Sequence, residues 1–89
     1  MTWTILLSDK VKKQLSKLDQ QSKSDILNFL YQDKLHQSPK SSGKNLRGNL
    51  KKFWRYRVGD YRIICEMKNS ELVVLVIDVG HRNKVYKTK

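Results

Sequence analysis

Four arginines in the second half of the chain are spaced so that one fold could bring them to a single site. They are Arg55, Arg57, Arg62 and Arg82. The planar guanidinium group forms paired hydrogen bonds with phosphate oxygens, so a cluster of arginines suits a polyanion. The alternative interpretation is a solvated basic surface that only aids solubility.

Two side chains beside Arg82 could transfer a proton. Tyr86 follows Arg82 by four residues, and a neighbouring cation favours the phenolate form of a phenol. His81 precedes Arg82, and imidazole exchanges protons near neutral pH. Spacing alone favours a packing role for Tyr86 at a sheet edge, and it allows His81 to be a loop residue that points into solvent.

The stretch from Trp54 to Cys65 predicts a β-hairpin that positions the first three arginines. Gly59 at the first of two central turn positions suits a type II′ turn, because that position needs φ > 0. A two-residue turn places Arg57 opposite Arg62, and alternation puts both on the face of Arg55. The other face is apolar and carries Trp54, Tyr56, Val58, Tyr61, Ile63 and Cys65. Opposed cations repel by roughly 0.2–1 kcal/mol, so a bound polyanion is the simplest reason for this face.

The rest of the chain predicts the elements that support the hairpin. We expect a strand over residues 2–6, a helix over 9–18, and a second helix that Ser22 caps and that ends near 34–37. The apolar run over 71–79 predicts a central strand covered on both faces. The order β-α-α-β-β-β indicates a single α+β domain over residues 1–89. It should have a small, mostly antiparallel sheet with an αα-hairpin packed on one face.

Composition limits the partners and the compartment. Nineteen Lys and Arg against eight Asp and Glu give a formal net charge of +11, which favours nucleic acid or another acidic partner. The one cysteine, Cys65, excludes an internal disulfide and fits a reducing compartment. No apolar run is long enough to cross a membrane, and residues 1–4 do not resemble a signal peptide. We therefore expect a cytoplasmic protein with no membrane partner.

The sequence predicts neither a metal nor a cofactor. The acids after Asp60 are scattered, at Glu66, Glu71 and Asp78, and no Cys/His set has zinc spacing. A protein that cuts a phosphodiester without a metal is best matched to RNA, whose 2′-hydroxyl can attack the adjacent phosphorus. The protein then positions the strand, accepts a proton and stabilises charge.

Three motifs in these regions resemble the RelE family of toxins, within the RelE/ParE superfamily of type II toxin–antitoxin systems. They are Leu46-Arg47-Gly48, the run from Trp54 to Ile63, and Val79-Gly80-His81-Arg82 with Val85-Tyr86. The superfamily shares the predicted β-α-α-β-β-β layout. In the RelE branch, the resemblance implies metal-free cleavage of messenger RNA in the ribosomal A site, leaving a 2′,3′-cyclic phosphate and a 5′-hydroxyl.

The resemblance also implies roles for single residues. Arg55, Arg57, Arg62 and Arg82 match the basic residues that stabilise the phosphate, and Tyr86 matches the tyrosine that works with the attacking hydroxyl. His81 is its rival, because related branches use histidine as acid or base. Further RNA contacts are expected from basic residues that precede the hairpin, which are Lys44, Arg47, Lys51 and Lys52. Plain surface charge is the alternative for Lys51 and Lys52.

The partners implied by the resemblance are a cognate acidic antitoxin, the ribosome and messenger RNA. We expect a monomer when the toxin is alone and a hetero-oligomer with the antitoxin. Two alternatives stay open. One is a ParE-like gyrase poison without nuclease activity, because the hairpin motif is shared by both branches. The other is a non-catalytic RNA- or ribosome-binding module that uses the same basic face.

Overall fold

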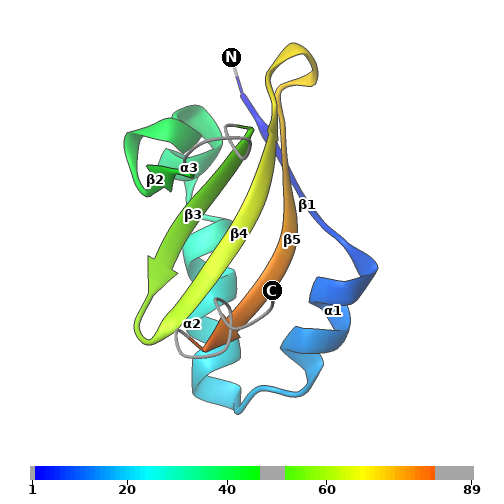
Figure 1. The fold of residues 1–89 in the computed structure, drawn as a ribbon. Helices are drawn as coiled ribbons and strands as arrows, with labels where there is room; N and C mark the ends of the chain where they lie inside the picture. The colour runs from blue at the N-terminus through cyan, green and yellow to red at the C-terminus, as the bar shows by residue number, and fades with distance from the viewer. Residues whose placement is uncertain (1, 47–51, 82–89) are drawn as a thin grey trace.

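A mostly antiparallel sheet runs through the molecule and has helices on one side of it (Figure 1). The structure is a computed structural model that describes residues 2–46 and 52–81. Within these residues the strand order is β1-β5-β4-β3-β2, and β1 runs parallel to β5 while the other neighbours are antiparallel. The strands are β1 (Thr4–Leu7), β2 (Lys44–Asn45), β3 (Phe53–Val58), β4 (Tyr61–Lys68) and β5 (Val73–His81). The predicted α+β class with a mostly antiparallel sheet is confirmed, and β2 is an addition.

The first helix begins where the sequence predicts. Helix α1 spans Asp9–Ser16, and the Ser8 hydroxyl accepts a hydrogen bond from the Val11 N–H at 3.1 Å. This bond satisfies one of the N–H groups left without a partner at a helix start. None of the described helices is long and apolar enough to cross a bilayer.

The second helix differs from the prediction at both ends. Helix α2 spans Gln20–Leu30, and its cap is Asp19 instead of Ser22, because the Asp19 carboxylate accepts from the Ser22 N–H at 3.1 Å. Hydrogen bonds from Ser22 lower the pKa of Asp19. Extended backbone at Gln32 ends the predicted long helix early, and a separate short helix, α3 (Asp33–Gln37), follows. The expectation of one helix reaching residues 34–37 is therefore wrong.

Helix α3 fixes the start of the chain. The Trp3 N–H donates to the His36 carbonyl at 2.7 Å, and the Nδ1 atom of His36 lies 3.1 Å from the Trp3 carbonyl oxygen. The two residues are far apart in sequence, so this exchange ties the strand β1 to the end of the helical segment.

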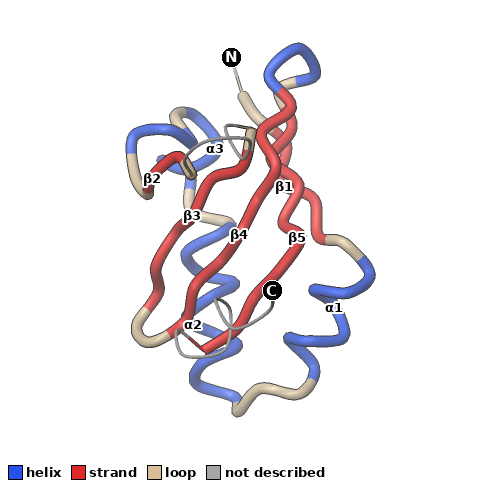
Figure 2. The backbone as a smooth tube through the Cα atoms, viewed as in Figure 1, coloured by secondary structure: helices blue, strands red, loops and turns tan. Residues whose placement is uncertain are grey.

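The helices lie behind the sheet, on one side of it (Figure 2). The two layers share one hydrophobic core. Helix α1 lies beside β5, and α2 crosses behind β3 and β4 (Figure 1). The most deeply buried side chains come from both layers and include Val11, Ile26, Leu30, Tyr56, Ile63, Cys65, Val74 and Val76. The prediction that the helix pair covers one sheet face is confirmed.

Strand β5 is central, but the described helices cover it on one face, so the prediction of two covered faces is wrong. Val74 and Val76 are buried, whereas Leu75 between them is half-buried. A register shift pairs Ile64 with Asp78 and Cys65 with Val76. The extra residue resets the alternation and returns Val79 to the core. The apolar run in the sequence is unbroken for two reasons. The bulge shifts the alternation, and the second face of β5 is half-buried and also carries apolar side chains.

Gly43 lets the segment before β2 approach β3 very closely. Its φ is +75°, and an added Cβ would lie 2.4 Å from the Arg55 carbonyl oxygen and 2.7 Å from the Trp54 Nε1 atom. The Trp54 Nε1–H donates to the Ser42 carbonyl at 2.7 Å, which holds this segment in place. Gly59 in the hairpin turn also has a positive φ, of +58°, but apart from its two chain neighbours no residue has an atom within 4 Å of its Cβ position.

We predict that Gly43→Ala destabilises the fold more than Gly59→Ala. Both substitutions put alanine in the left-handed region, at a cost of about 1–2 kcal/mol. Only Gly43→Ala adds a collision with backbone. Urea unfolding of the two variants measures the difference, and equal losses of free energy would contradict the close approach at Gly43.

Candidate functional site

The hairpin has the predicted register. Val58 pairs with Tyr61 across the turn, Arg57 with Arg62, and Arg55 with Ile64. In the described residues, Leu72 is the one non-glycine residue with a positive φ, so Gly59 alone carries the positive φ of this turn. That is the requirement of a type II′ turn. The three predicted arginines of the hairpin therefore share the face that the described helices leave open.

Strand β2 adds a fourth cation to this face. Lys44 pairs with Arg55 in the antiparallel register, so the two side chains lie on the same side. Together Lys44, Arg55, Arg57 and Arg62 form what we call the cationic face. Lys44 and Arg57 are exposed, and Arg55 and Arg62 are half-buried. The face thus contains two directly opposed pairs of cations, Lys44 with Arg55 and Arg57 with Arg62.

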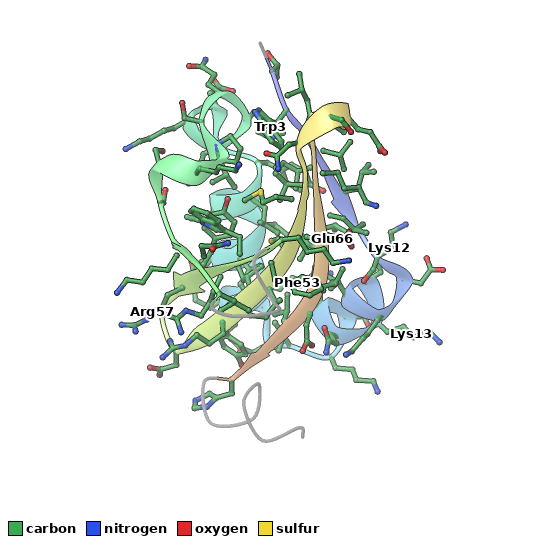
Figure 3. The ribbon with its side chains drawn as sticks, turned by 45° about the horizontal axis from the view of Figure 1, so that its top comes forward. Trp3, Lys12, Lys13, Phe53, Arg57 and Glu66 are labelled. Carbon is green, nitrogen blue, oxygen red and sulfur yellow. The ribbon has the colours of Figure 1, made fainter. Side chains whose placement is uncertain are left out.

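Carboxylates in neighbouring rows of the sheet bind other groups. Asp78 accepts from the Gln14 side chain at 2.8 Å and lies 3.5 Å from the Lys10 ammonium group. Glu66 lies 3.8 Å from the ammonium groups of Lys52 and Lys68. Figure 3 shows Glu66 and Phe53 further along the sheet than Arg57, which lies near the hairpin turn. The positive charge is therefore concentrated toward the turn.

His81 does not lie on the cationic face. It pairs with Tyr61, and the two rings contact edge to face with centroids 5.8 Å apart. Tyr61 shares its face with Ile63, which is buried under the helices. Alternation therefore puts the imidazole on the opposite side of the sheet from Arg57 and Arg62.

The remaining predicted residues divide into two groups. Lys52 is described and lies with its ammonium group 5.4 Å from the centroid of the Phe53 ring, beside Glu66 and away from the turn. The others lie outside the described residues, and their roles stay predictions. They are Arg47, Lys51, Arg82 and Tyr86.

Gln14 is a residue that the sequence analysis missed. Strand β1 ends at Leu7, which pairs with Val76, so β5 continues past its parallel neighbour. There the Gln14 side chain accepts from the Val79 N–H at 2.8 Å and donates to the Asp78 carboxylate at 2.8 Å. One amide group thus replaces the missing strand and holds the part of β5 that leads to His81. Gln14 lies within the predicted helix over residues 9–18, and its capacity both to donate and to accept was the one available signal.

The arrangement suits charge stabilisation more than metal chemistry. Within residues 2–46 and 52–81, no three His, Cys, Asp or Glu side chains gather as possible metal ligands. The cationic face instead offers guanidinium donors to an anion. The two buried titratable groups beneath it are poor proton carriers, because burial raises the pKa of both the Tyr56 phenol and the Cys65 thiol.

Comparisons with known proteins agree with one another. Residues 5–86 match the family described as the ParE toxin of type II toxin–antitoxin systems. The toxin RelG of Mycobacterium tuberculosis is 26% identical over 87 residues, which cover 98% of this chain and 99% of that protein.

Solved structures resemble the fold over most of its length. A chain of the toxin–antitoxin complex RelBE2 from Mycobacterium tuberculosis has a TM-score of 0.82 at 26% identity, covering 92% of this chain and 100% of that one. The isolated RelE toxin of E. coli has a TM-score of 0.75 at 23% identity, covering 94% of this chain and 90% of that one. At that identity the second likeness supports the fold alone.

We predict that Arg57→Gln does not destabilise the protein. The substitution keeps a long polar side chain and removes one cation from an opposed pair, so the free energy of unfolding should stay equal or rise by up to about 1 kcal/mol. Arg57→Lys keeps the charge and is the matched control. Thermal and urea unfolding compare the three proteins, and a clear loss of stability in Arg57→Gln alone would make Arg57 a structural residue.

Proposed function

This chain belongs to the ParE toxin family of type II toxin–antitoxin systems, and from that membership we propose that it is a ribosome-dependent endoribonuclease that cuts messenger RNA in the A site. The membership confirms the resemblance to RelE/ParE toxins seen in the motifs. The cationic face is the observation that carries the proposal, because two opposed pairs of cations on an open sheet face call for a bound polyanion.

The reaction in this proposal needs no external nucleophile. The 2′-hydroxyl attacks the adjacent phosphorus, the 2′-oxygen–phosphorus bond forms, and the bond to the 5′-oxygen breaks. Arg55, Arg57 and Arg62 hold the phosphate and stabilise the negative charge that grows in the transition state. The products are a 2′,3′-cyclic phosphate and a 5′-hydroxyl, whose oxygen takes up a proton.

The proton of the attacking 2′-hydroxyl needs an acceptor near the arginines. His81 packs on Tyr61, on the far side of the sheet from Arg57. That placement favours Tyr86 over His81 as the proton-handling group, with Arg82 as the further cation. Both assignments rest on the sequence motif.

A second candidate function is poisoning of DNA gyrase, as in the ParE branch. The family match favours this second function, because the matching family takes its description from the ParE toxin. The cationic face would then bind an acidic protein surface or DNA instead of messenger RNA.

We predict that Arg57→Gln and Arg62→Gln each lower the single-turnover rate of cleavage on programmed ribosomes by about 10²–10³, the typical cost of one lost stabilising donor. Lys12→Gln removes an exposed cation from α1, on the other side of the molecule from Arg57 (Figure 3), and should cleave normally. Tyr86→Phe should lose activity, whereas His81→Gln should keep it.

The end groups and a gyrase assay decide between the candidates. A 3′-hydroxyl with a 5′-phosphate on the products would contradict attack by the 2′-hydroxyl. Absence of cleavage together with inhibition of gyrase supercoiling would favour the ParE-like function.

We also propose that an acidic antitoxin binds the cationic face. The chain carries a net charge of +11, and opposite charge accelerates encounter and sets the docking register. The carboxylates of the antitoxin would neutralise the opposed cations and relieve their repulsion, as the phosphates of a bound RNA would. The free toxin is proposed to be a cytoplasmic monomer and the complex a hetero-oligomer.

Expression from the native operon should therefore yield a complex with a small acidic protein. Hydrogen exchange on this complex should show protection over residues 55–62 relative to the free chain. Protection confined to α1 would indicate that the antitoxin acts without covering the cationic face.

A further inference from the structure

The outer edge of β3 carries a half-open pocket beside the cationic face. Its volume is about 320 Å³, within the range of sites for small ligands. The lining side chains come from α2, from the segment that enters β2, and from β3, and they include Phe29, Lys44, Arg55, Tyr56 and Arg57. Residues distant in sequence thus meet at an edge that no hairpin motif predicts.

One wall of the pocket is aromatic and held in place. The half-buried Phe29 ring contacts the Tyr56 ring edge to face, with centroids 5.2 Å apart and planes at 60°. The Tyr56 hydroxyl donates to the Pro39 carbonyl at 2.5 Å. Tyr56 is buried, so the partly exposed Phe29 ring is the apolar surface open to a ligand.

The lining also contains cations. Lys44 and Arg57 are exposed, and no carboxylate is among the lining residues. An aromatic surface next to cations is the combination that binds single-stranded nucleic acid, because a base stacks on the ring while its phosphate pairs with the charges. A purely acidic ligand would use the cations and leave the ring without a role.

The backbone of β3 is open at the same place. Strand β2 pairs with Trp54 and Arg55, and the described residues supply no strand beyond that pair. On this edge the Phe53 carbonyl accepts from the Leu46 N–H at 3.1 Å. Backbone groups two and four residues further along a strand point the same way, so Arg57 presents its N–H and C=O to the pocket. These groups can hydrogen-bond to a base edge or ribose.

We propose that this pocket binds one nucleotide next to the scissile phosphate, with its base on Phe29 and its phosphate between Lys44 and Arg57. The inference rests on the proposed function, since an RNA strand on the cationic face continues past Arg57 into the pocket. Stacking on a ring tolerates any base, which suits a site that holds the strand and leaves the reacting phosphate to Arg55, Arg57 and Arg62.

Binding of an uncleavable probe to the free chain tests the pocket separately from catalysis. The probe is a fluorescent 2′-O-methyl hexaribonucleotide of mixed sequence, followed by anisotropy over a range of salt concentrations. Phe29→Leu should weaken binding about 5- to 150-fold, the range for loss of one stacked base. Tyr31→Leu is the matched control, because Tyr31 is the C-cap residue of the same helix, 53% exposed and outside the pocket.

Two further variants guard against a simple loss of folding. Phe29→Trp keeps an aromatic surface and should bind at least as tightly as the parent chain. Lys44→Gln should reduce the slope of log affinity against log salt by about 0.7, the value for one phosphate contact with a single strand. Lys12→Gln, which removes an equal charge from α1, should leave that slope unchanged.

The results separate this inference from the proposed function. If the parent chain cleaves on ribosomes while Phe29→Leu and Lys44→Gln bind the probe normally, the pocket proposal is wrong and the nuclease proposal is supported. If the parent chain does not cleave while both variants bind the probe weakly, the nuclease proposal is wrong and the pocket is supported as an RNA-binding site. A deca-glutamate peptide that binds through Lys44, with no effect of Phe29 on the RNA probe, would assign the pocket to a protein partner.

Discussion

Repulsion between opposed cations on one face of a hairpin is the constraint to which the rest of this structure responds. Arg57 with Arg62 and Lys44 with Arg55 each cost roughly 0.2–1 kcal/mol. The same strands bury Ile63 and other apolar side chains on the opposite face, and one such burial contributes about 1.5–3 kcal/mol. Alternation along a strand thus lets the core offset a charged surface that is unfavourable by itself.

The two outer edges of the sheet are completed in different ways, and both bear on function. On one side Gln14 replaces the strand that β5 lacks and holds the segment leading to His81. On the other side Gly43 lets the chain approach β3, and the short strand β2 pairs only with Trp54 and Arg55. The edge of β3 at Arg57 therefore has no neighbouring strand among the described residues. One edge supports the chain toward the predicted catalytic tail, and the other forms the pocket for a flanking nucleotide.

Family membership narrows the biology to a toxin of a type II toxin–antitoxin system, within which we proposed a nuclease and, second, a gyrase poison. A shared fold does not decide between these two functions, so the groups on the sheet face must. Here that face has clustered guanidinium groups, and the described histidine nearest to it in sequence, His81, packs on the far side. The assignment of the proton acceptor therefore depends on Tyr86 and on the experiments that remove it.

The sequence by itself determined the local features of this protein. The Gly59 turn, the Arg57–Arg62 register and the start of the first helix at residue 9 each depend on residues a few positions apart, so spacing and turn chemistry sufficed to predict them. Only the tertiary structure decided the break between α2 and α3, the bulge in β5, the pairing of Lys44 with Arg55, and the meeting of Phe29 with Tyr56. These features depend on residues that are distant in the chain. Packing against the core decides whether they form, and local propensity does not.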